Sequence, residues 1–214
     1  MGKSALVTGG GKGLGREIAL AYAEEGADVA IGARTTADIE RVAAEIGHLG
    51  RRALAIPCDV REEEQVTRMV QRTVGEFGKL DILVNGAGSD GVVGPVWETT
   101  IAQWQTVFDA YLTGTFRSIR AAIPQMIKQR QGIIINLSSW VGQPGERPIG
   151  FGAYAIAKWG IEGLTQLLAA EAAPYNIRVN AIGRVALLPL PPCSAMGPSV
   201  SGSISTTART DMLR

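Results

Sequence analysis

A serine and, further along the chain, a closely spaced tyrosine and lysine are the residues of this sequence best suited to proton transfer. Tyr154 and Lys158 are four residues apart near the start of an expected helix, so both side chains leave the same helix face. A free phenol, with a reference pKa of about 10, is a poor acid or base at neutral pH, but a neighbouring cation favours its ionised form. Ser139 follows an expected buried strand, where its hydroxyl can hydrogen-bond a carbonyl or alcohol oxygen. These residues predict a site at which a tyrosine exchanges a proton with a carbonyl or alcohol substrate.

A glycine-rich turn near the start of the chain predicts a phosphate-binding site. Residues 5–7 form an apolar run typical of a buried strand, and residues 17–25 have the pattern of a helix. Between them Gly9, Gly13 and Gly15 have the spacing G-x3-G-x-G. A glycine turn at this place lets the backbone approach a diphosphate, and free N–H groups and the helix dipole face its charge. The spacing alone is also compatible with a turn that binds nothing, and the flanking strand and helix favour the phosphate site.

Strands and helices alternate along most of the chain. Six apolar runs predict strands at residues 5–7, 28–33, 53–57, 80–84, 133–137 and 177–182. Five segments predict helices at residues 17–25, 36–49, 61–77, 100–130 and 153–173. The alternation predicts an α/β fold with a Rossmann-like, doubly wound parallel sheet of order 3-2-1-4-5-6 and helices on both faces. The turns after the strands then open on one edge, where the glycine turn, Ser139 and Tyr154 would meet.

Composition and length narrow the class of protein further. The 214 residues suit one domain, which we expect over residues 1–186, followed by an irregular Pro/Ser/Thr/Gly-rich tail over residues 187–214. The net charge of +1 gives no reason to expect a nucleic-acid or membrane partner, and no metal-ligand spacing occurs. No apolar run has the length of a membrane span, and the start lacks a signal-peptide pattern. Cys58 lies in an apolar run and fits a buried thiol, so we expect a cytoplasmic protein.

Taken together, the motifs resemble the short-chain dehydrogenase/reductase family over residues 3–182. The matching residues are Thr8-Gly9, Gly13-Leu14-Gly15, Asp59-Val60, Asn85-Gly86-Ala87-Gly88, Ser139, Tyr154, Lys158 and Arg178-Val179-Asn180-Ala181. The resemblance implies hydride transfer between a nicotinamide cofactor and a carbonyl or secondary alcohol, with Ser139, Tyr154 and Lys158 as catalytic residues and Tyr154 as general acid or base. The overall resemblance favours members that reduce 3-oxoacyl groups.

The resemblance also implies the contacts to the cofactor. Lys158 would bind the nicotinamide ribose hydroxyls, Asp59 would hydrogen-bond the adenine, and the segment 85–88 would line the ribose side. The implied cofactor-binding set is Thr8, Gly9, Lys12, Gly13, Leu14, Gly15, Arg34, Asp59, Val60, Asn85, Ala87, Gly88, Tyr154 and Lys158.

The end of the second predicted strand indicates which cofactor is preferred. An acidic residue there would bind a ribose 2′-hydroxyl, but this chain has Ala33 followed by Arg34. Lys12 adds a second cation from the glycine turn. Both could be ordinary solvated charges, but two cations near the place of a 2′-phosphate favour NADP(H) over NAD(H).

Two features depart from the family pattern. Tyr111 takes the place of an asparagine that supports a water-mediated proton relay to the lysine in the family. Residues 183–185 replace a Pro-Gly turn, and no substrate lid or seventh strand is visible in the tail, which is either divergent or foreign sequence. A second interpretation therefore stays open, a catalytically impaired NADP(H)-binding or interaction protein of the same fold. Because family members commonly pair through the two long helices, we expect a homodimer or homotetramer.

Overall fold

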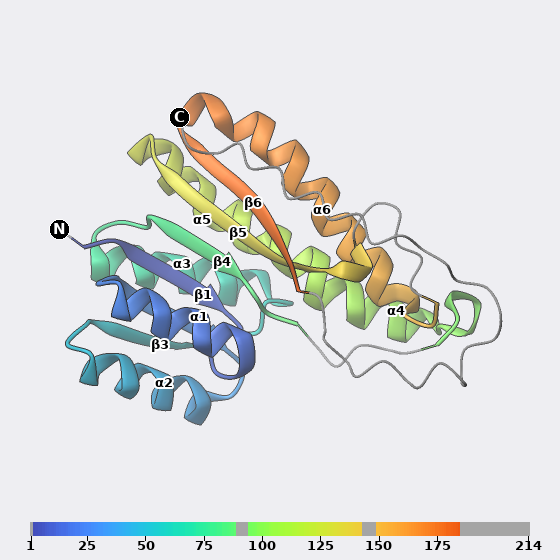
Figure 1. Cartoon of the computed structure of the whole chain (residues 1–214), viewed down its shortest axis with the longest axis horizontal. Coiled ribbons are helices and arrows are strands. Elements are labelled where there is room, and N and C mark those ends of the chain that lie inside the picture. Colours follow the sequence, from blue (N-terminus) through green and yellow to red (C-terminus); the bar gives the residue numbers. More distant parts are fainter. Residues whose placement is uncertain (1, 89–93, 143–148, 185–214) are drawn as a thin grey trace, which may run out of the picture.

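The computed structural model describes residues 2–88, 94–142 and 149–184, and its centre is a six-stranded parallel sheet of order β3-β2-β1-β4-β5-β6 (Figure 1). The strands are β1 (Ser4–Thr8), β2 (Asp28–Ala33), β3 (Ala53–Pro57), β4 (Ile82–Asn85), β5 (Gly132–Ser139) and β6 (Ile177–Arg184). All five strand pairings are parallel. The predicted fold class and strand order are confirmed. The predicted tail and the residues after Arg184 lie outside the described residues.

The helices follow the predicted alternation. They are α1 (Gly13–Glu24), α2 (Thr36–His48), α3 (Glu63–Phe77), α4 (Ile101–Phe108), α5 (Gly114–Gln129) and α6 (Gly152–Ala172). Short turns complete the set: η1 (Val96–Glu98), η2 (Asp109–Thr113), η3 (Trp140–Gly142) and η4 (Ala173–Tyr175). Among these helices, none is long and apolar enough to cross a membrane.

The long helix predicted over residues 100–130 has an internal irregularity. Thr100 caps its start through a reciprocal pair of hydrogen bonds with Gln103. A π-helical turn, η2, then separates α4 from α5. Such a turn holds one extra residue and changes which side chains face inward, and π turns are frequent at functional sites. The apolar pattern carries no signal for this change of backbone hydrogen bonding, so the sequence predicted a regular helix.

Apolar side chains of the strands form two buried clusters, one on each face of the sheet. Each face has its own layer of helices (Figure 1). Leu6, Leu83 and Ile134 pack with α3, α5 and α6 on one face. Val7 and Ile31 pack with α1 and α2 on the other. Because both faces are covered, the strands are apolar at nearly every position, as the sequence shows.

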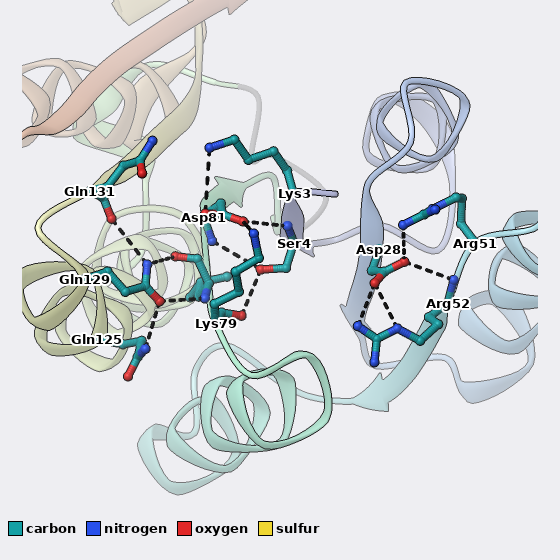
Figure 2. Close-up of polar contacts among 11 residues, drawn as sticks. Lys3, Ser4, Asp28, Arg51, Arg52, Lys79, Asp81, Gln125, Gln129 and Gln131 are labelled. Atoms are coloured by element: carbon teal, nitrogen blue, oxygen red, sulfur yellow. Dashed lines mark hydrogen bonds and ion pairs between the residues drawn. The ribbon is translucent and has the colours of Figure 1, made fainter. Parts of the chain in front are cut away.

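Polar contacts fasten the amino ends of the central strands, on the edge opposite the glycine turn (Figure 2). Asp81, which directly precedes β4, accepts a hydrogen bond from the Ser4 backbone N–H at 2.9 Å and pairs with the Lys79 ammonium at 2.7 Å. The side-chain amide of Gln129 accepts from the Leu80 N–H and donates to the Leu80 carbonyl, both at 2.9 Å. These contacts fix β1, β4 and the end of α5 at one edge and leave the other edge to the turns.

Asp28, at the start of β2, makes a similar tie to the start of β3. Its carboxylate pairs with the guanidinium groups of Arg51 and Arg52, each at 2.7 Å (Figure 2). Burial alone would raise the pKa of Asp28, but the hydrogen bonds from Arg52 and the charges of both arginines outweigh it, and the pKa lies below its usual value.

We expect Asp28→Asn to lower the free energy of unfolding by about 1–2 kcal/mol at neutral pH, because two charge-assisted contacts to partly exposed arginines weaken. Since the folded-state pKa is lowered, the contribution is present above the usual aspartate pKa of 3.8 and is lost as the pH falls through the folded-state value. Urea unfolding of parent and variant at neutral pH and at a pH below that range measures the difference, which should shrink in acid. The control Glu64→Gln removes an exposed pair with Arg68 and should cost at most about 0.5 kcal/mol. Equal losses in the two variants would contradict the expectation.

Candidate active site

Two adjoining clefts open over the carboxyl ends of the strands and share Gly9, Lys12 and Gly86 in their linings. Cleft A, of about 370 Å³, is lined by the turns after β1, β2, β3 and β4 and by η2. Cleft B, of about 440 Å³, is lined by the turns after β1 and β4, the end of β5 with η3, and the start of α6. The carboxyl ends of parallel strands meet at one edge, and this is where ligands bind in such sheets.

Most of the residues that the sequence singled out line one or both clefts. Cleft A contains Gly9, Lys12, Arg34, Asp59, Val60, Ala87 and Gly88. Cleft B contains Gly9, Lys12, Leu14, Gly15, Ser139 and Tyr154. Four predicted site residues line neither cleft, namely Thr8, Gly13, Asn85 and Lys158.

Lys158 lies beneath the clefts, with 5% of its surface exposed. Its Nζ donates a hydrogen bond to the Leu137 carbonyl of β5 at 2.6 Å and lies 5.6 Å from the centroid of the Tyr154 ring. Burial lowers the pKa of Lys158 to about 8, against the opposing charge of Glu162. Most of these amines are therefore charged at neutral pH, and the charge lies beside the phenol that lines cleft B.

Tyr111, at the centre of η2, is a second aromatic neighbour of Lys158. The Lys158 Nζ lies over its ring, 4.7 Å from the centroid. The rings of Tyr111 and Tyr154 meet edge to face, 5.1 Å apart and at 74°. A side chain at Gly88 would collide with the Tyr111 ring, so the ring occupies the space above that bare backbone.

Thr8 and Asn85 support the clefts from below. The Thr8 hydroxyl accepts hydrogen bonds from the N–H groups of Gly86 and Ala87, at 3.1 and 3.3 Å. It therefore holds the turn after β4 in place. Asn85 is 4% exposed, and its Nδ2 donates to Asn136 Oδ1 at 2.8 Å.

Asn136 continues this buried contact to α6. Its Nδ2 donates to the Thr165 hydroxyl at 2.9 Å, and that hydroxyl donates to the Ile161 carbonyl at 2.7 Å. The chain from Asn85 through Asn136 to Thr165 joins β4, β5 and α6. It fixes the register of the helix that carries Tyr154 and Lys158.

The structure also places residues at the clefts that sequence reasoning did not assign. Arg61 lines cleft A and holds the Asp59 carboxylate at 2.6 Å; this hydrogen bond is the main reason that the pKa of Asp59 lies below its usual range. Asp38 lines the same cleft and pairs with Arg41 at 3.1 Å. Their positions in the sequence could have indicated this role, because both lie shortly after a predicted strand and the clefts are built from the turns that follow the strands.

On the cleft B side, Trp140 and Phe151 form part of the lining, and their rings meet edge to face at 5.8 Å. Ser138 also lines cleft B; its hydroxyl is buried and has no hydrogen-bond partner among the described residues. Among residues 2–88, 94–142 and 149–184, no group of three or more His, Cys, Asp or Glu side chains is placed to hold a metal ion.

Comparison with known proteins agrees with this arrangement. Residues 3–186 match the family model described as short chain dehydrogenase, and the chain belongs to this family of oxidoreductases. The 3-oxoacyl-acyl-carrier-protein reductase FabG of Staphylococcus aureus is 43% identical over 185 residues, which are 85% of this chain and 73% of that protein.

Solved structures show the same likeness. The crystal structure of an NAD⁺-bound xylitol dehydrogenase matches with a TM-score of 0.81 and 39% identity, over 85% of this chain and 69% of its own. A 3-ketoacyl-ACP reductase from Sinorhizobium meliloti matches with a TM-score of 0.80 and 36% identity, over 83% of this chain and 70% of its own.

The turn beneath both clefts depends on a glycine at position 15. A Cβ there would collide with the Gly9 carbonyl. We therefore expect Gly15→Ala to destabilise the protein by about 1–3 kcal/mol, as overpacking does. Gly47, in α2, has open space where its Cβ would lie, so Gly47→Ala should leave stability unchanged or raise it by up to about 1 kcal/mol. Thermal melts of the two variants compare the effects, and a Gly15→Ala melt like that of the parent would show that the turn tolerates a side chain.

Proposed function

We propose that this protein is an NADPH-preferring reductase of carbonyl groups, which transfers a hydride between the cofactor and a carbonyl or secondary alcohol. The observation that carries the proposal is the placing of Tyr154 and Ser139 in one cleft, with the charged amine of Lys158 buried beside the Tyr154 ring. A phenol that lines a cleft, with a cation fixed behind it, is suited to general acid–base work.

The residues of the two clefts fit a nicotinamide dinucleotide. The N-terminus of α1 follows the glycine turn, and Lys12 lines both clefts. Free backbone N–H groups at a helix start suit a diphosphate. When bound, the nicotinamide ring supplies the hydride in reduction and accepts it in oxidation.

Each catalytic residue then has a distinct task. The Ser139 hydroxyl orients the substrate oxygen by a hydrogen bond, and Tyr154 gives that oxygen a proton during reduction. The Lys158 ammonium stabilises the phenolate left behind, because it is held near the ring in a site of low dielectric constant. In the oxidation direction Tyr154 takes the proton from the alcohol instead.

Preference for NADPH is supported by the charges at cleft A. Lys12 and Arg34 both line it, and β2 ends in Ala33 without an acid. Asp38 could receive a ribose hydroxyl, but its carboxylate pairs with Arg41. The fold alone does not decide the matter, because the xylitol dehydrogenase that it resembles is NAD⁺-bound.

The likeness to 3-oxoacyl-acyl-carrier-protein reductase makes a 3-oxoacyl thioester the first substrate to test. Exposed Phe116, Trp159 and Leu167 on α5 and α6 support the expected pairing of two copies through these helices. A second candidate function is cofactor binding without turnover. It is favoured by Tyr111, whose ring fills the space beside Lys158 where the family relay needs a water.

Tyr154→Phe should keep the fold and NADPH affinity but lower turnover about 10²–10⁴-fold, because only the proton-carrying hydroxyl is lost. NADPH oxidation with acetoacetyl thioesters and a panel of diketones measures turnover, and fluorescence titration measures NADPH binding. Tyr175→Phe, a change in η4, serves as the control and should behave like the parent. Near-normal turnover of Tyr154→Phe would exclude it as the proton donor. NADPH binding by a parent protein without turnover would favour the second candidate.

The double variant Lys12→Ala/Arg34→Ala should weaken NADPH binding about 10²-fold or more and leave NADH binding nearly unchanged. Each charge-assisted hydrogen bond to the 2′-phosphate is worth about 1.5–3 kcal/mol, and NADH lacks that group. Calorimetric titration with both cofactors gives the ratio of affinities. Lys128→Ala removes an exposed cation on α5 and should change neither value. Equal losses for NADPH and NADH would show that Lys12 and Arg34 do not bind the 2′-phosphate.

A further inference from the structure

The surroundings of the Lys158 amine hold one neighbour that the proposed chemistry has not used. The amine donates to the Leu137 carbonyl and lies over the rings of both Tyr111 and Tyr154. The nearer of the two rings is that of Tyr111, at 4.7 Å against 5.6 Å. An ammonium over an aromatic face is attracted by the ring quadrupole, and the attraction is stronger where water is excluded.

Several contacts fix the Tyr111 ring in this place. Its ring packs edge to face with the Tyr154 ring, and the bare backbone of Gly88 lies beneath it. The π-helical turn η2 sets the backbone from which the side chain leaves, between α4 and α5. Tyr111 thus contacts the lysine, the tyrosine and the cofactor-side turn at once.

We propose that Tyr111 is a positioning residue for the catalytic pair: its ring holds the buried ammonium of Lys158 and sets the ring of Tyr154 by direct contact. The inference rests on the proposed roles of Lys158 and Tyr154. In this proposal the aromatic face of Tyr111 helps to keep the desolvated amine of Lys158 charged.

Among the described residues, groups from three elements act on the amine. Tyr154 and Glu162 face it from α6, Tyr111 from η2, and the Leu137 carbonyl from β5. Among the described residues, Glu162 is the charged group that acts on Lys158, and its charge raises the pKa that burial lowers to about 8.

Three substitutions at position 111 distinguish the effect of the aromatic ring on Lys158 from the effect of filling the same space. Tyr111→Phe keeps the aromatic face and should leave the Lys158 pKa near 8. Tyr111→Leu keeps an apolar filling but removes the aromatic face, so the pKa should fall by about one pH unit. Tyr111→Asn opens space for water, which should raise the pKa toward the usual lysine value of 10.5.

The lysine titration can be measured without cofactor or substrate. The full chain is reductively methylated with labelled formaldehyde over a range of pH, and the Lys158 peptide is quantified by mass spectrometry. Thermal melts confirm that each variant is folded, and Tyr111→Met replaces Tyr111→Leu if the latter does not fold. Tyr175→Leu removes a distant ring and should leave the Lys158 titration as in the parent.

The proposal is supported if the Lys158 pKa is unchanged in Tyr111→Phe, lower in Tyr111→Leu and higher in Tyr111→Asn. The rate of carbonyl reduction should follow, with its decline at high pH near 8 in the parent and Tyr111→Phe and about one pH unit lower in Tyr111→Leu. Equal Lys158 titrations in Phe and Leu would overturn the proposal, because a purely steric role treats the two alike. If the titrations differ as expected but no variant turns over, Tyr111 positions the lysine and the proposed reductase function fails.

Discussion

The geometry of the candidate site depends on a buried ammonium. Lys158 is almost fully removed from water, and its charge is compensated by one carbonyl at 2.6 Å, two aromatic rings and the field of Glu162. The compensation is incomplete, since the pKa is about 8 against the usual 10.5. Protonation of this amine therefore opposes folding, and the free energy of unfolding rises as the pH rises from about 8 to 10.5. Other interactions in the fold must therefore offset the cost of burying this charge.

Helix α6 and the strands beneath it hold Lys158 in place. Hydrogen bonds from Asn85 to Asn136 and from Asn136 to Thr165 join β4, β5 and α6, and all three residues are buried. Buried polar contacts of this kind fix one register, because any slip leaves their atoms unpaired. The network is not fully satisfied, since Asn85 Oδ1 has no partner among the described residues. Gly142 adds a close approach, with its Cβ position 2.8 Å from the Lys158 backbone, so η3 and α6 meet without an intervening side chain.

The fold could be predicted from the sequence because it follows from local patterns of apolar and polar residues. Alternating strands and helices determine a parallel sheet, and the handedness of the crossovers limits its order. Ser139 and Tyr154 could be placed at one cleft by the same logic, since Ser139 ends β5 and Tyr154 lies near the start of α6, the next long helix in the chain. Thr8 and Asn85 could not be placed as accurately, because their partners are many residues distant and their side chains turn beneath the clefts. The π turn at Tyr111 was missed because it changes backbone hydrogen bonds without changing the apolar pattern.

The charges of cleft A show how a neutral chain can still present a cationic surface to a ligand. Its two acids are each paired with an arginine close by in sequence, Asp59 with Arg61 and Asp38 with Arg41. Paired acids contribute little field at a distance, because each dipole falls off faster than a single charge. Lys12 and Arg34 make no ion pair within the described residues, so their charges remain available to an anionic ligand. A net charge of +1 for the whole chain is therefore compatible with unpaired cations at this one cleft, because the acids there are paired with arginines.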